Sequence, residues 1–373
     1  MRGGNDIRMN KFFIDPDIKK AETLPAEFYR SGEIFEQAKN DVFARSWQFV
    51  DDTDLVKIPG QVHPFTLLDG YLDEPLLLTR DNEDNIHCLS NVCTHRGNIL
   101  IENPDVLKIM QCRYHGRRFE LNGCFKSMPE CEDALNFPTE KDNLSKIKFG
   151  QWDKFLFVSL NPTIPLEKIT GDMIKRLEGV NLGNMINEPT RSRDYLVKAN
   201  WALYCDNYLE GFHIPYVHAG LNEKLDYGNY ASEIYEFSNL QLAIAKRGEE
   251  SFELHETSPD YGSEIAAYYW WLFPNTMFNF YPWGLSINVV RPLAKDLTKV
   301  SFITYVSDPS RLDKGAGSGL DRVEREDEAI VEKVQKGVSS RFYSRGRYSP
   351  KREQGVHHFH SLLVKFLNDN SAS

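Results

Sequence analysis

Two short segments of the chain place a cysteine beside a histidine. The first reads NVCTHRGNIL and contains Cys93 and His95, and the second reads CRYHG and contains Cys112 and His115. Thiolates and imidazoles bind both zinc and iron-sulfur clusters, so the residue types alone allow either site. Each segment supplies one residue of each type, whereas zinc fingers place their cysteines together and their histidines together. The mixed pairing favours two irons, with the cysteines on one iron and the histidines on the other.

The remaining cysteines have no metal-ligand companions at a suitable spacing. The sequence indicates a protein of a reducing compartment, where disulfides are rare and a Cys/His cluster points to a metal or to catalysis. We therefore expect small buried side chains at the other four positions: Cys88, Cys124, Cys131 and Cys205.

A second candidate metal site lies in NWALYCDNYLEGFHIPYVHAG, residues 200–220. Asn207, Glu210 and His213 recur every three residues and so fall on one face of a predicted helix. His218 follows five residues after His213, about 140° round an ideal helix, which would point the two imidazoles apart. Pro215 stands between them and is expected to bend or break the helix, so that both rings can turn to one point.

A carboxylate would complete a facial triad, which holds iron(II) and leaves positions open for dioxygen and substrate. The helical pattern DRVEREDEAIVEKVQKGV offers Asp327 on the apolar stripe predicted for Val323, Ile330 and Val334. A carboxylate on a buried face needs a partner, and a metal is one. The flanking acids, Glu326 and Glu328, are expected to point away. On the residues alone, a capping or salt-bridge role for Asp327 stays open.

The elements that must position these residues change character along the chain. Residues 25–46 have helical spacing, and short apolar or alternating runs separated by turn residues then predict antiparallel strands up to about residue 160. Residues 161–172 are expected to be a linker. The remainder mixes predicted helices at 199–213 and 321–336 with aromatic strand-like runs between 268 and 306. These patterns predict an α+β protein. They divide the chain into three predicted segments: 1–46, 47–160 and 161–373.

Composition excludes several classes of protein. The formal charge of −10 argues against a nucleic-acid or anionic-membrane surface, since a polyanion would be repelled. No apolar run is long enough to span a bilayer, and MRGGNDIRMNKFF lacks the apolar core of a secretory signal. We therefore expect a soluble cytoplasmic protein with no nucleic-acid or membrane partner.

At both candidate metal sites the sequence resembles the Rieske non-heme iron oxygenases. CTHRG and CRYHGRRFELNG are similar to the Rieske 2Fe-2S motif, and residues 200–220 are similar to the segment of the oxygenase α subunit that carries two iron-binding histidines. EDEAIVEKVQKG resembles the segment that carries the third ligand. DNYLEGFH, VQKG and GVHHFHSLL also resemble the branch that acts on quaternary ammonium compounds, which includes carnitine oxygenase, glycine betaine demethylase and choline monooxygenase.

The resemblance implies an all-β Rieske domain over residues 47–160 and a helix-grip catalytic domain with a large antiparallel sheet over 161–373. Residues 1–46 would form a helical segment that packs on the catalytic domain. The implied cofactors are a 2Fe-2S cluster and a mononuclear Fe(II). The implied ligands are Cys93, His95, Cys112 and His115 for the cluster, and His213, His218 and Asp327 for the iron.

Glu210 takes the place of the acid that, in this family, bridges a Rieske histidine of one subunit to an iron-binding histidine of the next. The resemblance therefore implies a homotrimer, with Asn207 beside Glu210 as a further catalytic residue. The usual bridging residue is Asp, so this chain departs from the pattern at Glu210. It departs again at Arg117, where many members have Trp, and we expect this change to alter a surface that meets an electron donor or a neighbouring subunit.

The resemblance implies a terminal oxygenase that uses dioxygen and electrons from a separate NAD(P)H-dependent reductase, with or without a ferredoxin. The aromatic stretch from Tyr268 to Trp283 could wall a cavity, since aromatic faces attract quaternary ammonium groups and also stack with rings. We expect monooxygenation of an N-methylated or quaternary amine. The alternatives are ring hydroxylation of an aromatic acid and, from another class, a Rieske electron carrier or sensor with a non-catalytic ligand domain. The terminal histidines, His357, His358 and His360, are expected to pack structurally.

Overall fold

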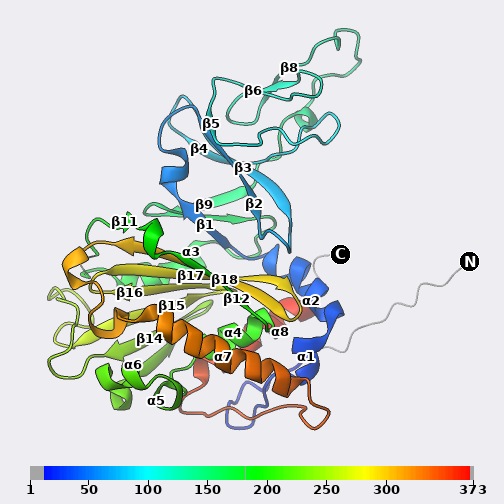
Figure 1. Cartoon of the computed structure of the whole chain (residues 1–373). Coiled ribbons are helices and arrows are strands. Elements are labelled where there is room, and N and C mark those ends of the chain that lie inside the picture. The colour runs from blue at the N-terminus through cyan, green and yellow to red at the C-terminus, as the bar shows by residue number, and fades with distance from the viewer. Residues whose placement is uncertain (1–11, 181, 370–373) are drawn as a thin grey trace, which may run out of the picture. The chain divides into compact units, whose positions relative to one another are not determined.

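The computed structural model describes residues 12–180 and 182–369, which form two compact units. One unit comprises Phe43–Leu166, and the other joins the described residues before Phe43 to those from Glu167 onward. Figure 1 shows the course of the chain through both units. The absence of a secretory signal was predicted from residues 1–13, of which 1–11 lie outside the described part of the chain.

The unit Phe43–Leu166 is built from short antiparallel strands, as its broken apolar runs predicted. Its strands form three small sheets with the orders β1-β10-β9, β4-β3-β2-β5 and β6-β7-β8. The strands are β1 (Gln48–Asp52), β2 (Gln61–Leu67), β3 (Glu74–Arg80), β4 (Ile86–Ser90), β5 (Asp105–Val106), β6 (Met110–Gln111), β7 (Arg118–Phe119), β8 (Phe125–Ser127), β9 (Lys148–Trp152) and β10 (Phe155–Ser159).

The other unit contains an eight-stranded antiparallel sheet with the order β11-β18-β17-β16-β15-β14-β13, and β12 pairs with β18. The expected α+β class and the large antiparallel sheet are confirmed. The strands are β11 (Ile186–Asn187), β12 (Arg193–Val197), β13 (Ala231–Ile234), β14 (Ser238–Ile244), β15 (Ile265–Leu272), β16 (Thr276–Tyr281), β17 (Gly284–Ala294) and β18 (Leu297–Val306).

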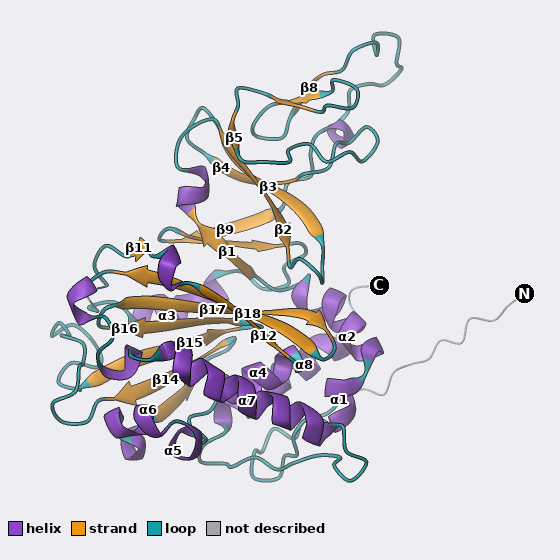
Figure 2. Ribbon diagram, viewed as in Figure 1, coloured by secondary structure: helices purple, strands orange, loops and turns teal. Residues whose placement is uncertain are grey.

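Helices cover this sheet, and α4 packs on β17, α8 on β13, and α7 on both α4 and β12 (Figure 2). The helices are α1 (Ala26–Arg30), α2 (Gly32–Ala38), α3 (Glu167–Arg176), α4 (Trp201–Tyr208), α5 (Ile214–Val217), α6 (Ala219–Lys224), α7 (Leu320–Val338) and α8 (Gln354–Asn368). In the described part of the chain, no helix is long and apolar enough to cross a membrane.

The sequence predictions for residues 25–46 and for the linker 161–172 need correction. The helical spacing of residues 25–46 becomes α1, α2 and a π-helical turn at Lys39–Phe43, because Ser31 caps α2 and ends the first run. The predicted linker 161–172 is shorter than expected, since α3 already begins at Glu167 and buries Ile169, Thr170 and Met173.

A row of polar side chains crosses the large sheet. Gln241, Tyr269, Asn279, Ser286 and Thr304 stand directly opposite one another on β14, β15, β16, β17 and β18. Side chains directly opposite in an antiparallel sheet lie on the same face. Because successive residues of a strand alternate between faces, their neighbours form an apolar row on the other face: Leu240, Trp270, Phe278, Ile287 and Ile303.

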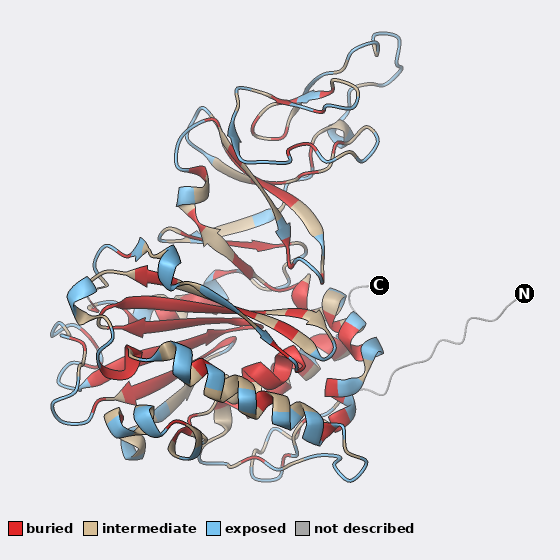
Figure 3. Cartoon of the chain, in the orientation of Figure 1, coloured by how far each residue is buried: buried red, intermediate tan, exposed pale blue. Residues whose placement is uncertain are grey.

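Helix α8 covers the face that carries the polar row. Trp271 lies two residues after Tyr269 and so shares its face, and Phe359 of α8 packs on Trp271 with ring centroids 5.3 Å apart. Phe359 also contacts Trp201 at the start of α4. Figure 3 shows that the strands of this sheet are mostly buried. Buried amides and hydroxyls on a covered face need polar partners. The polar row is therefore a candidate lining for a ligand-binding site.

Candidate metal centres and active-site cavity

The two Cys/His segments form loops with matching backbone geometry. Gly97 N–H donates to the Cys93 carbonyl at 3.0 Å, and Gly116 N–H donates to the Cys112 carbonyl at 3.0 Å. Each cysteine N–H donates in turn to the carbonyl five residues on, at 2.8 Å in both loops. Both glycines have positive φ, +70° and +75°, which a side chain would strain.

The donor set of these loops fits a 2Fe-2S cluster. Cys93 and Cys112 are both 2% exposed, and the His95 and His115 rings lie at the half-exposed tips with centroids 4.7 Å apart. His115 Nδ1 is buried and has no hydrogen-bond partner among the described residues, so it is available as a ligand. Asn98 Nδ2 approaches Cys112 Sγ at 3.7 Å from the other loop.

Neighbouring groups favour the ionised form of the Cys112 thiol, whereas burial and Cys112 raise the pKa of the Cys93 thiol. Burial opposes ionisation of Cys112, but the backbone N–H of Tyr114, the Cys93 thiol and the backbone N–H of His115 together lower the pKa of Cys112 below its usual value. Thiolates, not thiols, bind metal. Among the other cysteines Cys88 and Cys205 are buried as expected, whereas Cys124 and Cys131 are half-exposed, which corrects that prediction.

Arg117 does not lie on the surface, and this corrects the expectation that it alters a docking surface. Its side chain is 3% exposed, and its Nη2 donates to Asp142 Oδ1 at 2.6 Å. The guanidinium carbon lies 4.8 Å from the ring centroid of Phe125 and 5.5 Å from that of Phe137. Arg117 therefore fills an interior position of the unit, where it pairs with a carboxylate and packs on aromatic faces.

The segment that carries the two histidines of the second site is not one helix. α4 ends at Tyr208, and Glu210 and His213 follow in the turn after it, so the predicted shared helix face is wrong. His213 and His218 stand at the two ends of the four-residue helix α5, with Pro215 in its first turn. The chain breaks before His213 rather than at Pro215, and residues that flank a short helix can turn their rings together.

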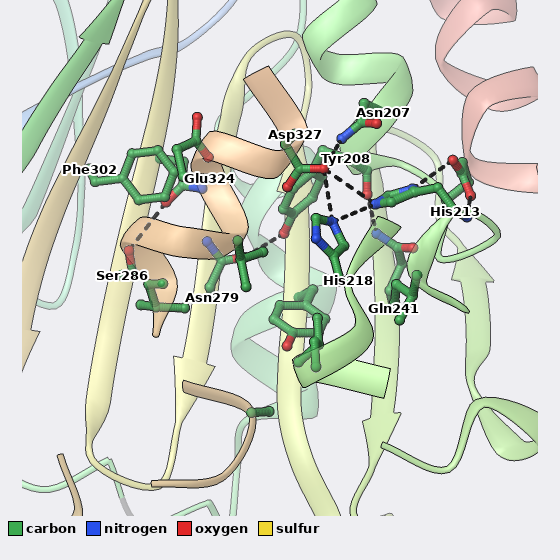
Figure 4. Close-up of a pocket in the computed structure, with 18 of the residues that line it drawn as sticks. Asn207, Tyr208, His213, His218, Gln241, Asn279, Ser286, Phe302, Glu324 and Asp327 are labelled. Carbon is green, nitrogen blue, oxygen red and sulfur yellow. Dashed lines mark hydrogen bonds and ion pairs between the residues drawn. The ribbon is translucent and has the colours of Figure 1, made fainter. Parts of the chain in front are cut away.

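The second site brings three donor atoms together. His213 Nε2 and His218 Nε2 are 3.1 Å apart, and Asp327 Oδ1 lies 3.0 Å from His218 Nε2 and 3.4 Å from His213 Nε2 (Figure 4). Metal-ligand bonds of about 2.1 Å at right angles place neighbouring donors about 3.0 Å apart. The three atoms therefore fit one face of a metal ion, which is the arrangement of a facial triad.

A carboxylate holds the far nitrogen of each histidine. Glu210 accepts hydrogen bonds from His213 Nδ1 at 2.8 Å and from the His213 backbone N–H at 3.0 Å. Glu326 accepts from His218 Nδ1 at 2.8 Å and from Arg322 Nε at 2.9 Å. With both Nδ1 atoms occupied as donors, Nε2 is the nitrogen of each ring that is left for a metal. Glu326 therefore points to the site, against the expectation that it points away.

The carboxylates around these histidines shift the pKa values of the site. Burial alone would lower the pKa of His213, but Asp327 and Glu210 raise it to about 10. Burial would raise the pKa of Asp327, but the two histidines lower it to about 2. In the absence of a metal the imidazoles thus hold protons that balance the acids, and a divalent cation can replace these protons.

Asn207 and α7 position the carboxylate of Asp327. Asn207 Nδ2 on α4 donates to Asp327 Oδ1 at 2.6 Å. On α7 the buried residues are Glu324, Val331 and Val338, whereas Val334 is 42% exposed. The buried face of α7 is therefore rotated away from the predicted apolar stripe through Val323, Ile330 and Val334. It contains the acid Glu324, where an apolar residue was expected.

A cavity of about 110 Å³ adjoins the three donor atoms. The polar row supplies Gln241, Tyr269, Asn279 and Ser286 to its lining, and α7 supplies Glu324 and Asp327 (Figure 4). The rest of the lining includes five further aromatic side chains and two further amides: Tyr204, Tyr208, Tyr230, Tyr281, Phe302, Asn207 and Asn288. Of the aromatic stretch Tyr268–Trp283, only Tyr269 and Tyr281 line the cavity, and most of the others are core.

Burial raises the pKa of the lining tyrosines, so they stay neutral phenols. Tyr208 OH donates to Asn279 Oδ1 at 2.7 Å, and Tyr230 OH donates to Gln241 Oε1 at 3.3 Å. These bonds tie the aromatic and amide groups into one network. The amide and hydroxyl lining residues on the strands, Gln241, Asn279, Ser286 and Asn288, were missed from the sequence, although polar residues at alternate positions of apolar strands were a signal that could have found them.

The three histidines of α8 have protein partners and lie outside the metal-binding group. His360 is buried and bonds Asp206 Oδ1 at 2.8 Å and Tyr348 OH at 2.7 Å. His357 bonds the Asp15 carbonyl, and His358 bonds Asn239 Oδ1. The structure thus accounts for them by packing and hydrogen bonding, as the sequence predicted.

Comparison with known proteins agrees with this arrangement. Residues 46–139 match the Rieske [2Fe-2S] domain family, and residues 186–369 match the family of the ring hydroxylating alpha subunit (catalytic domain). The chain is 31% identical to the chloroplastic choline monooxygenase of Arabidopsis thaliana, over 94% of this chain and 84% of that protein. It is 29% identical to the carnitine monooxygenase oxygenase subunit of Escherichia coli strain K12, over 94% and 95% of the two chains.

Solved structures share the fold. A quaternary ammonium Rieske monooxygenase superposes with a TM-score of 0.75 at 22% identity, over 94% of this chain and 96% of that one. The naphthalene 1,2-dioxygenase of Rhodococcus sp. superposes with a TM-score of 0.72 at 17% identity, over 94% and 95%. The chain therefore belongs to the Rieske non-heme iron oxygenases, as an oxygenase α subunit. Such a subunit carries a 2Fe-2S cluster and a mononuclear iron, acts on a small molecule and takes electrons from a separate reductase.

Proposed function

We propose that this oxygenase hydroxylates a quaternary or N-methylated amine, and that His213, His218 and Asp327 bind its mononuclear iron. The observation that carries the proposal is the convergence of three donor atoms within 3.0 to 3.4 Å at a tyrosine-rich cavity. Tyrosine faces attract quaternary ammonium groups when water is excluded. The relatives named choline monooxygenase and carnitine monooxygenase support this substrate class.

We assign Cys93, His95, Cys112 and His115 as the cluster ligands. When bound, the cluster supplies single electrons and the mononuclear iron activates dioxygen. In the overall reaction one oxygen atom enters a C–H bond of the substrate and the other leaves as water, with two electrons from the reductase and two protons. The chain's own groups position the substrate and exclude water, while Glu210 and Glu326 keep the two histidines oriented.

Glu210 has a second role in this proposal, as the bridge to a Rieske histidine of a neighbouring copy in a homotrimer. Its carboxylate already holds His213, and the nearby Phe212 and Tyr216 are 39% and 81% exposed. Asn207 acts through Asp327 and is thus a positioning residue. The electron donor would be an NAD(P)H-dependent reductase, directly or through a ferredoxin, and the protein would work in the cytoplasm.

The test combines iron analysis with oxygen uptake. The purified protein should contain three irons per chain, two in a cluster with a Rieske electron paramagnetic resonance signal and one mononuclear. With a surrogate reductase, choline or L-carnitine should stimulate oxygen uptake. His213→Ala should keep the Rieske signal but contain two irons and show no stimulated uptake. Three irons in His213→Ala would refute the ligand assignment, and uptake stimulated only by aromatic acids would refute the substrate class.

A further inference from the structure

Glu324 is a buried acid of the cavity for which the iron site gives no role. It is 4% exposed and lies on α7 one turn before Asp327. Tyr204 OH donates to its Oε2 at 2.7 Å, but its Oε1 is buried without a partner among the residues that the structure describes. Burial and the nearby Asp327 raise the pKa of Glu324 above its usual value. A cation bound in the cavity would favour the ionised carboxylate and offset the cost of its burial.

The cavity gives Glu324 no positive partner. None of the described residues that line it is a lysine or an arginine, and its other acids, Glu210 and Asp327, are paired with the two histidines. Glu324 is thus the acid left for a ligand. A cation in the cavity would gain an opposite charge, whereas a ligand carboxylate would meet a like charge that no lysine or arginine of the lining balances.

Two arginines, Arg191 and Arg193, belong to a neighbouring cavity that shares Ser286, Phe302 and Leu320 with the first. Both of them are already engaged. Arg191 pairs with Asp313 at 2.8 Å, and Arg193 Nη1 donates to the backbone carbonyls of Thr190 and Ser192 at 2.6 and 2.7 Å. They therefore offer no free charge to a substrate carboxylate.

Neutral donors, by contrast, are available in the cavity. Asn279 and Asn288 accept hydrogen bonds through Oδ1 from Tyr208 and Ser286. Their Nδ2 groups have no partner in the described ranges and can donate to a ligand oxygen. A hydroxyl or carbonyl oxygen can accept these bonds without bringing a negative charge near Glu324.

We propose that Glu324 makes the cavity selective for a cation that carries an uncharged polar group, such as choline, over a zwitterion that carries a carboxylate, such as L-carnitine. This inference rests on the proposed function, because it takes the cavity to be the substrate site. The tyrosine faces hold the ammonium group, Glu324 supplies its counter-charge, and Asn279 and Asn288 bind the polar group.

The test is anaerobic calorimetric binding to the full-length, iron-loaded protein, with choline, tetramethylammonium and L-carnitine as probes. Choline should bind to the unmodified protein at least about tenfold more tightly than L-carnitine. Glu324→Gln should weaken choline binding by at least about tenfold, so that the affinities for choline and L-carnitine become more similar. Glu328→Gln, the same change one turn later and outside the cavity lining, should leave both affinities unchanged.

Tighter binding of L-carnitine by the unmodified protein, or unchanged choline affinity in Glu324→Gln, would overturn the role of Glu324 while leaving quaternary amines as ligands. Binding of none of the three probes would overturn the proposed substrate class as well. If circular dichroism shows that Glu324→Gln is misfolded, Glu324→Asp keeps the charge and should retain the preference for choline. The selectivity of the unmodified protein is decisive in either case.

Discussion

At the scale of single residues, a change at Glu326 tests whether the orientation of His218, the proposed iron ligand, matters for metal binding. Glu326 touches the donor set only through His218 Nδ1. Removal of such a hydrogen-bonding partner typically lowers metal affinity by about 10- to 100-fold. Glu326→Ala should therefore weaken binding of the mononuclear iron by that factor in a chelator competition assay, while the Rieske signal stays intact. Glu328→Ala is the matched control, and equal iron affinity in both variants would contradict the role assigned to Glu326.

Arg117 offers a prediction about stability at a position where the family pattern is broken. Arg117→Met removes the cation that pairs with Asp142 and packs on Phe125. Removal of one partner from a fully buried ion pair costs about 3–5 kcal/mol. Since the Asp142 side chain is 19% exposed and can regain water, we expect a smaller cost, roughly 2 kcal/mol. Urea unfolding followed through cluster absorbance measures it, and a variant as stable as the parent would contradict the pairing.

The same pair predicts a pH dependence. The Arg117 guanidinium, with help from Thr139, lowers the pKa of Asp142 below its ordinary value of 3.8, so the folded protein holds the ionised form more strongly than the unfolded chain does. This contribution is fully present above pH 3.8 and is lost as the pH falls through the lower folded value. The stability difference between the parent and Arg117→Met should therefore be constant near neutral pH and shrink below pH 4. If the stability difference between the parent and Arg117→Met grew on acidification, the pKa of Asp142 would be shifted in the opposite direction.

At the scale of elements, alanine substitutions at two helix glycines should change the stability of the protein in opposite directions. A Cβ on Gly355 of α8 would lie 2.3 Å from the carbonyl oxygen of Leu209, the residue before Glu210, whereas a Cβ on Gly337 of α7 would meet nothing within 4 Å. Gly337→Ala should stabilise by about 0.5–1 kcal/mol through helix propensity. Gly355→Ala should destabilise by about 1–3 kcal/mol because α8 must move from the end of α4. Denaturant unfolding measures the stability of both variants. If both were more stable than the parent, α8 would be able to move away from the Leu209 carbonyl at no cost.

The elements also show what the sequence could and could not reveal. The geometry of the Cys93 and Cys112 loops was predictable because their cysteines, histidines and glycines are local in sequence. Asp327 could be proposed from its place on a helix, but the rotation of α7 could not, since it depends on the burial of Glu324 beside Tyr204, 120 residues away. The polar row on the sheet was missed for the same reason. Alternating polar residues could have marked the individual strands, but the row itself depends on the register across five strands, which no single strand displays.

At the scale of the whole molecule, the two units have separate cores, and we predict that the core of one unit depends on its metal cluster. Cys93 and Cys112 belong to the core cluster of Phe43–Leu166, together with Leu77, Leu89, Met110 and Phe119. This unit has only small sheets, so the free energy of cluster binding is part of its folding free energy. The other unit has an eight-stranded sheet and needs no cluster for its core.

Loss of a cluster ligand should therefore unfold one unit and spare the other. We expect Cys112→Ser to lose the visible absorbance of the cluster and to keep one iron per chain. In calorimetry the transition of Phe43–Leu166 should disappear, while that of the larger unit remains. Cys131→Ser, a half-exposed cysteine in the same unit, is the matched control and should keep three irons and both transitions. Retention of the cluster in Cys112→Ser would remove Cys112 from the ligand set. Loss of both transitions would instead show that the larger unit also depends on the cluster.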